Sequence, residues 1–201
     1  MKTVKDAFEE VSAWVEVPAD NKKGFKIKYV YSGPWYIWRT EPEEIQKSKV
    51  VIGILCLLDM ILFAAAGLMP GSVNTVKWVE IPGLFSLLAL VYEITGVVAF
   101  CRSKEKMLQP DFRRIKTYLG AAPVVRGVLT LATAAGSVYA IGMTEVTAYH
   151  IATTVLFLLS SVASLIMWKR FVKIPHTSEK NDILKHIHDG VLEDGIEAYF
   201  L

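Results

Sequence analysis

Three ionisable residues lie inside the apolar segments of this chain, where a charge is most costly. Asp59 interrupts the run LCLLDMILFAAAG, Glu93 lies in the next apolar run, and Arg126 lies in a segment rich in Ala, Gly and Thr. Near the centre of a bilayer, each charge costs roughly 2.5–3.5 kcal/mol on insertion scales. One arginine and two acids can form a buried ion network, or can leave a titratable acid that couples to protons or cations.

The three residues lie at similar depths in their segments. Asp59 is ten residues after the start of its segment, Glu93 is eight residues before the end of its segment, and Arg126 is eight residues after the start of the third. At 1.5 Å per residue, each lies about 12–15 Å from the same end. We therefore expect Asp59, Glu93 and Arg126 to form one charge cluster, with the choice of acid paired to Arg126 left open.

Hydroxyl and imidazole side chains extend a polar face on two of the segments. Starting from Arg126, hydroxyl residues recur at positions i+4, i+7 and i+11, which lie on one helix face. Similar spacing is found in the last segment, where Ser164 follows the same pattern. The predicted polar seam comprises Thr130, Thr133, Ser137, His150, Thr153 and Ser161. Small residues such as Gly96, Gly127 and Gly136 should let these helices approach one another closely.

The elements that position these side chains are four long apolar runs. The 201 residues are 53% apolar, with a mean hydropathy of +0.37. Spans of about 20 residues, long enough for 30 Å of hydrocarbon, are expected at residues 49–69, 79–101, 118–141 and 147–168. The third contains Pro123, but omitting it would put the two chain ends on opposite sides of a membrane. The prediction is an all-α integral membrane protein with a four-helix transmembrane bundle over residues 41–170.

Charge asymmetry predicts the orientation of this bundle. Of the 22 Lys and Arg residues, 20 lie in the N-terminal segment, in the connection between the second and third spans, or in the tail. The exceptions are Lys77 and Arg126. Cytoplasmic loops of membrane proteins carry the excess of Lys and Arg. Both ends are therefore expected in the cytoplasm, and the bundle is expected in the cell membrane. The first span should serve as its own uncleaved insertion signal.

The N-terminal segment, residues 1–40, is predicted to be a small cytoplasmic module. Val4, Phe8, Val11 and Val15 recur at helical spacing before Pro18, which predicts a helix. The following GFKIKYVYSG alternates apolar and polar residues, which predicts a short strand and a turn.

Two further signals concern the start of the bundle and the tail. Thr40 and Glu43 form a capping-box pattern around Pro42, so the first helix should begin near Glu41. The tail, residues 171–201, is expected to contain one short amphipathic cytoplasmic helix, because Ile183 and Ile187 share a face.

Several function classes find little support in the sequence. A net charge of +2 gives no reason to expect nucleic acid as a partner. No nucleotide-binding loop or catalytic motif is found, so no catalytic residue, cofactor or metal is predicted. Cys56 and Cys101 form no CxxC pair, and His186 and His188 are two apart, which on a helix places them on different faces.

The leading functional prediction is a multi-pass membrane protein that is a non-enzymatic subunit or accessory component of a larger assembly. Its protein partner, or a second copy, would bind the N-terminal module and tail, while the lipid bilayer surrounds the bundle. The alternative is a small transporter or channel component that uses the charge cluster. A membrane enzyme acting on lipid comes third.

Overall fold

Four long helices make up most of the chain. The computed structural model describes residues 12–18, 25–143 and 146–180. The helices are α2 (Pro42–Leu68), α3 (Lys77–Arg102), α4 (Gln109–Ile141) and α5 (Ala148–Val172). Each is long and apolar enough to cross a membrane, because 20 residues at 1.5 Å per residue span about 30 Å. The prediction of a mostly helical chain with four membrane-length helices is confirmed.

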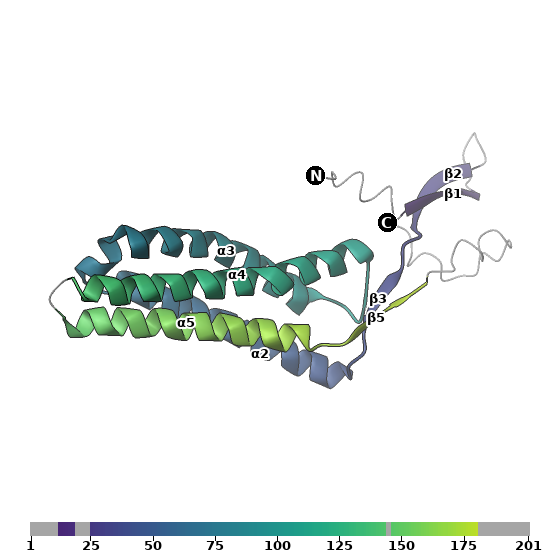
Figure 1. Cartoon of the computed structure of the whole chain (residues 1–201). Helices are drawn as coiled ribbons and strands as arrows, with labels where there is room; N and C mark the ends of the chain where they lie inside the picture. Colours follow the sequence, from purple (N-terminus) through teal and green to yellow (C-terminus); the bar gives the residue numbers. More distant parts are fainter. Residues whose placement is uncertain (1–11, 19–24, 144–145, 181–201) are drawn as a thin grey trace. The chain divides into compact units, whose positions relative to one another are not determined.

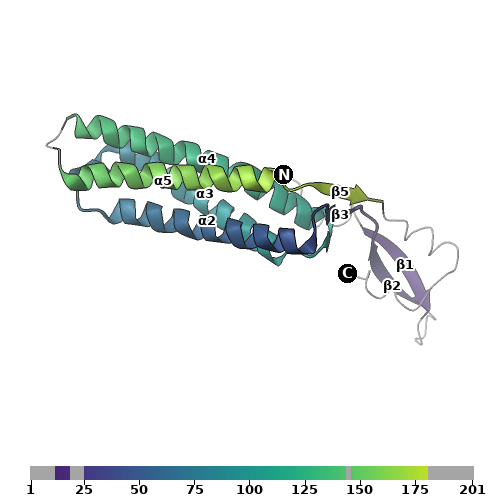
Figure 2. The ribbon, with the colours of Figure 1, turned by 90° about the horizontal axis from the view of Figure 1, so that it is seen from below.

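The four helices lie side by side and alternate in direction (Figures 1 and 2). Helix α2 packs on α3 and α5. On the opposite side, Ser161 of α5 donates a hydrogen bond to the Gly127 carbonyl of α4, and Gly96 of α3 lies against Leu119 of α4. Each helix therefore has two neighbours, and the start of α2 and the end of α5 lie at the same end of the bundle.

Local signals explain where α2 begins and ends. The helix begins at Pro42 with Glu41 as its N-cap, close to the expected start. The predicted Thr40–Glu43 capping box is wrong, because no side chain of the described residues caps this end. At the other end, η1 (Ser72–Thr75) replaces the loop expected between the first two spans. The Asn74 amide donates hydrogen bonds to the carbonyls of Ala66 and Met69, at 3.1 and 3.3 Å. These bonds satisfy carbonyl groups that the end of a helix leaves without partners.

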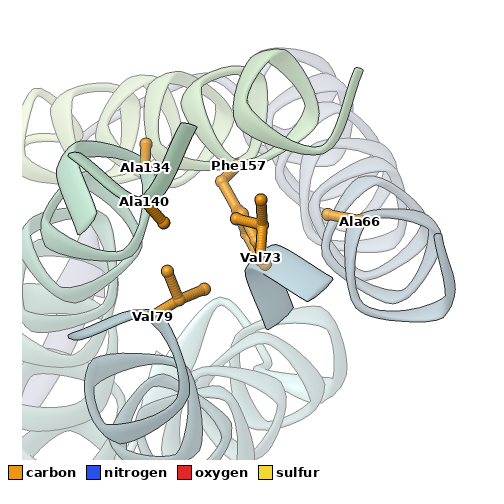
Figure 3. Close-up of a cluster of buried hydrophobic side chains, with 6 residues drawn as sticks. All are labelled: Ala66, Val73, Val79, Ala134, Ala140 and Phe157. Carbon is orange, nitrogen blue, oxygen red and sulfur yellow. The ribbon is translucent and has the colours of Figure 1, made fainter. Parts of the chain in front are cut away.

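Apolar side chains pack the bundle at both ends. At the η1 end, Figure 3 shows a cluster of buried aliphatic residues and one phenylalanine; its members are Ala66, Val73, Val79, Ala134, Ala140 and Phe157. At the opposite end, Phe100 of α3 packs edge-on against Trp38 and Phe171, with ring centroids 5.5 and 5.7 Å apart. The charge cluster lies between these two apolar layers along the helices.

A second unit of the chain contains the strands outside the helices. β1 (Ser12–Pro18) and β2 (Phe25–Tyr31) form an antiparallel pair. A three-stranded sheet in the order β4-β3-β5 joins β3 (Trp35–Trp38), β4 (Lys106–Met107) and β5 (His176–Glu179). The sheet thus combines the N-terminal segment, the α3–α4 connection and the segment after α5. Buried Tyr31 anchors this unit, because its hydroxyl accepts a hydrogen bond from the Gln109 amide and donates one to the Pro34 carbonyl.

The helix predicted through Val15 is wrong over Ser12–Pro18. This segment forms β1, and each of its residues pairs with a residue of β2. Its sequence SAWVEVP also alternates, and β-branched and aromatic residues suit a strand once a partner strand is available. The strand predicted within GFKIKYVYSG is confirmed over Phe25–Tyr31 as β2. The rest of the predicted N-terminal helix and the predicted tail helix lie outside the described residues.

Candidate functional site: a buried charge network

The structure brings the three residues of the charge cluster together from three helices. Asp59 of α2, Glu93 of α3 and Arg126 of α4 are all 0% exposed. Arg126 Nη1 lies 2.5 Å from Asp59 Oδ2 and 3.1 Å from Glu93 Oε1. Both acids therefore contact the same guanidinium nitrogen, and neither is the sole partner of Arg126.

Two serines of α5 complete the network. Ser160 Oγ donates a hydrogen bond to Asp59 Oδ1, and Ser164 Oγ lies 3.1 Å from Glu93 Oε2. All four carboxyl oxygens therefore have a polar contact, and all four helices contribute to what we call the charge network: Asp59, Glu93, Arg126, Ser160 and Ser164. Ser160 was not predicted as a site residue. Its position seven residues after Thr153 and four before Ser164 places it on the same helix face and could have indicated it.

The rest of the guanidinium group faces an aromatic ring. The Phe63 ring centroid lies 5.5 Å from Arg126 Cζ, within the range of a cation–π contact. Within the described part of the chain, Nε and Nη2 of Arg126 have no hydrogen-bond partner. The acids thus hold the guanidinium through Nη1 alone.

The residues of the predicted polar seam are all buried, but most of their hydroxyl groups donate hydrogen bonds to the backbone of their own helix. The hydroxyls of Thr130, Thr133, Ser137 and Thr153 each donate to the backbone carbonyl four residues earlier, at 2.9 Å. Ser161 differs, because its hydroxyl bonds across to α4 at 2.7 Å. The polar seam therefore stabilises individual helices and one helix contact, without a continuous chain of side-chain hydrogen bonds.

His150 lies apart from the charge network. It is in the first turn of α5, ten residues before Ser160, or about 15 Å along the helix. A Cβ atom at Gly71 would be 3.0 Å from His150 Cδ2, so the imidazole packs closely on the α2–η1 connection. Nδ1 is buried and, among the described residues, has no hydrogen-bond partner. Nδ1 of His150 therefore takes no part in the hydrogen bonding of the polar seam.

Charge balance and hydrogen bonding both favour a neutral Glu93. Two carboxylates and one guanidinium would leave a net negative charge in an interior of low dielectric constant, which is unfavourable. Ser164 Oγ lies 3.0 Å from the Pro123 carbonyl oxygen as well as beside Glu93. Because a hydroxyl has only one proton to donate, both contacts are satisfied when Ser164 donates to Pro123 and the proton between Ser164 and Glu93 belongs to Glu93.

We therefore expect Glu93→Gln to keep nearly the full stability of the protein, within about 1 kcal/mol. A glutamine can accept the bond from Arg126 and donate its amide proton to Ser164. Asp59→Asn should cost more, because it removes the carboxylate that balances the arginine. Thermal unfolding of both variants in one detergent checks this order. A larger loss for Glu93→Gln would show that Glu93 carries the negative charge.

Comparison with known proteins finds no match among family models, curated proteins or solved structures. The fold and the site together define a protein of four membrane-length helices joined by a buried ion network.

Proposed function

We propose that this chain is an integral membrane protein, with both ends in the cytoplasm, that acts as a non-enzymatic subunit or accessory component of a membrane assembly. The observation that carries the proposal is the distribution of polarity in the bundle. Large apolar side chains face outward along all four helices, for example Leu57, Leu88, Val128 and Val162, while 13 polar or charged residues are buried among those that the structure describes. Water favours the opposite arrangement, whereas hydrocarbon favours this one.

The positions of the basic residues support the proposed orientation. The start of α2, the α3–α4 connection and the end of α5 lie at one end of the bundle (Figure 1), and most of the Lys and Arg residues are in or beside these segments. At the other end, the connections α2–α3 and α4–α5 contain no Lys or Arg, and Lys77 is the first residue of α3. By the positive-inside rule, the basic end faces the cytoplasm.

Cysteine labelling tests this topology. In a chain whose Cys56 and Cys101 are replaced by Ala, Thr75→Cys is placed at the proposed outer end and Lys104→Cys at the cytoplasmic end. A membrane-impermeant thiol reagent should label the first in intact cells and the second only after lysis. Labelling of both, or the reverse pattern, would reject the orientation.

Two features support a role in an assembly. The charge network gives every carboxyl oxygen a partner within the chain, as expected of charges that fix helix pairing. The strand unit collects three separate segments into one small sheet, which helix insertion does not require. A small sheet with little core of its own is suited to docking on a partner.

Mass spectrometry of the protein purified in mild detergent tests the assembly role. The intact chain is compared with one that lacks residues 1–30, which retains Tyr31 and β3. We expect a stoichiometric protein partner that is lost on deletion, while the melting temperature of the bundle is unchanged. A chain that purifies without any protein partner would reject the proposal.

One observation favours transport as a second candidate. Glu93 is fully buried close to Arg126, whose Nε and Nη2 have no hydrogen-bond partner among the described residues, and this places a titratable group in the middle of the bundle. Purified protein in vesicles containing a pH-sensitive dye would then conduct protons, and Glu93→Gln would abolish the conductance. The assembly role predicts no proton movement in either protein.

A further inference from the structure

A pocket with a volume of about 720 Å³ opens between the start of α2 and the end of α5. Its lining includes five basic residues and one acid; these are Arg39, Lys47, Lys169, Arg170, Lys173 and Glu44. The basic residues are exposed, and within the described part of the chain none of them forms an ion pair. Five cations and one carboxylate line this cavity, so its lining carries a net positive charge that favours an anion.

The backbone at the pocket adds to its attraction for anions. The pocket includes Thr40, directly before the N-terminus of α2, a helix of 27 residues. No side chain caps this end of the helix, and the buried Thr40 Oγ1 has no hydrogen-bond partner among the described residues. The positive end of the helix dipole favours a phosphate at such a position, and the five cations of the pocket outnumber the acids Glu43 and Glu44 of the first turn.

A backbone hydrogen bond joins the two segments that form the pocket. The Arg39 amide donates a hydrogen bond of 2.9 Å to the Pro175 carbonyl. This bond fixes the chain before α2 against the chain after α5. The cationic side chains on the two segments are therefore held near one another before any ligand binds.

An apolar track leads from the pocket along the outer face of α5. Ile166 lines the pocket and is 44% exposed, and it lies one turn from the cationic Arg170. Val162 and Leu159 continue the same face further along the helix and are also exposed. A ligand with an anionic head and a long apolar chain would match both parts of this surface.

We propose that this pocket binds the phosphate headgroup of an anionic phospholipid, whose acyl chain follows the exposed face of α5. The inference rests on the membrane insertion proposed above, which places the pocket at the cytoplasmic surface. Basic pockets between spanning helices on that side suit anionic headgroups. The lipid would bridge the first and last helices of the bundle.

Native mass spectrometry of the full chain in mild detergent tests the proposal. The protein is offered equal amounts of phosphatidylglycerol and phosphatidylcholine with identical acyl chains. The pocket variant is Lys169→Gln/Arg170→Gln/Lys173→Gln. The control variant, Arg102→Gln/Lys104→Gln/Arg113→Gln, removes the same charge from residues that do not line the pocket. We expect the wild-type and control proteins to prefer phosphatidylglycerol, and the pocket variant to lose that preference by roughly tenfold or more.

Three outcomes would overturn the proposal. The wild type could retain both lipids equally, or the control variant could lose as much preference as the pocket variant. The third is a melting temperature that rises with inorganic phosphate but not with phosphatidylglycerol, which would identify a soluble phosphate compound as the ligand. Insertion is measured separately, by resistance to alkaline extraction from membranes. A chain that resists extraction but shows no lipid preference rejects the lipid site alone.

Discussion

The Arg126→Gln variant is expected to lose about 3–5 kcal/mol of folding free energy. Arg126 is fully buried and contacts both Asp59 and Glu93 through Nη1. Its removal leaves two buried acids without a positive charge and also removes the contact with the Phe63 ring. The measurement is the midpoint of thermal or denaturant unfolding in detergent, compared with the wild type.

Two further variants show whether this loss comes from the charge network. Arg114→Gln removes an exposed charge from the same helix and should change stability by less than about 0.5 kcal/mol. The triple variant Asp59→Asn/Glu93→Gln/Arg126→Gln replaces all three ionisable side chains with neutral ones and should recover part of the loss. If Arg126→Gln unfolds at the wild-type midpoint, the network does not stabilise the bundle.

The Gly136→Ala variant should lose roughly 1–3 kcal/mol from overpacking. A Cβ atom at this position would overlap the Trp78 carbonyl group, with the carbonyl carbon 2.9 Å away. Because the obstacle is backbone, no side-chain rotation can relieve the overlap. The start of α3 would have to move away from the end of α4, which disturbs the aliphatic cluster around Val79.

Gly120→Ala provides the matched control on the same helix. A Cβ atom there would meet nothing within 4 Å, so the substitution should be neutral or should stabilise by up to about 1 kcal/mol through helix propensity. Unfolding midpoints of the two alanine variants are compared in one detergent. Equal midpoints would show that α3 and α4 do not depend on close contact at Gly136.

The charge cluster was predictable because helix geometry converts residue counts into depth. With a fixed rise per residue, three segments of alternating direction place Asp59, Glu93 and Arg126 in one layer, and the structure has them in direct contact. Ser160 was harder to foresee. Hydroxyl residues are common in spanning helices, and which of them meets an acid depends on how α5 packs on α2 and α3.

The strand unit and the basic pocket could not be predicted from the sequence, for a related reason. β4 has two residues and β5 has four, too few to show an alternating pattern. The β1 segment fits helical and strand patterns alike until its pairing with β2 decides between them. The pocket is formed by residues about 130 positions apart in the chain, so no local sequence pattern predicts it.

The order in which the residues of the charge network are synthesised constrains how the protein folds. Asp59 and Glu93 belong to the first two long helices, while Arg126 and the two serines belong to the last two. Both acids are therefore synthesised before Arg126, Ser160 and Ser164. In the membrane insertion proposed above, the early helix pair would enter the bilayer with protonated acids or wait beside the insertion machinery. The native bundle can then form only after α4 and α5 have been synthesised.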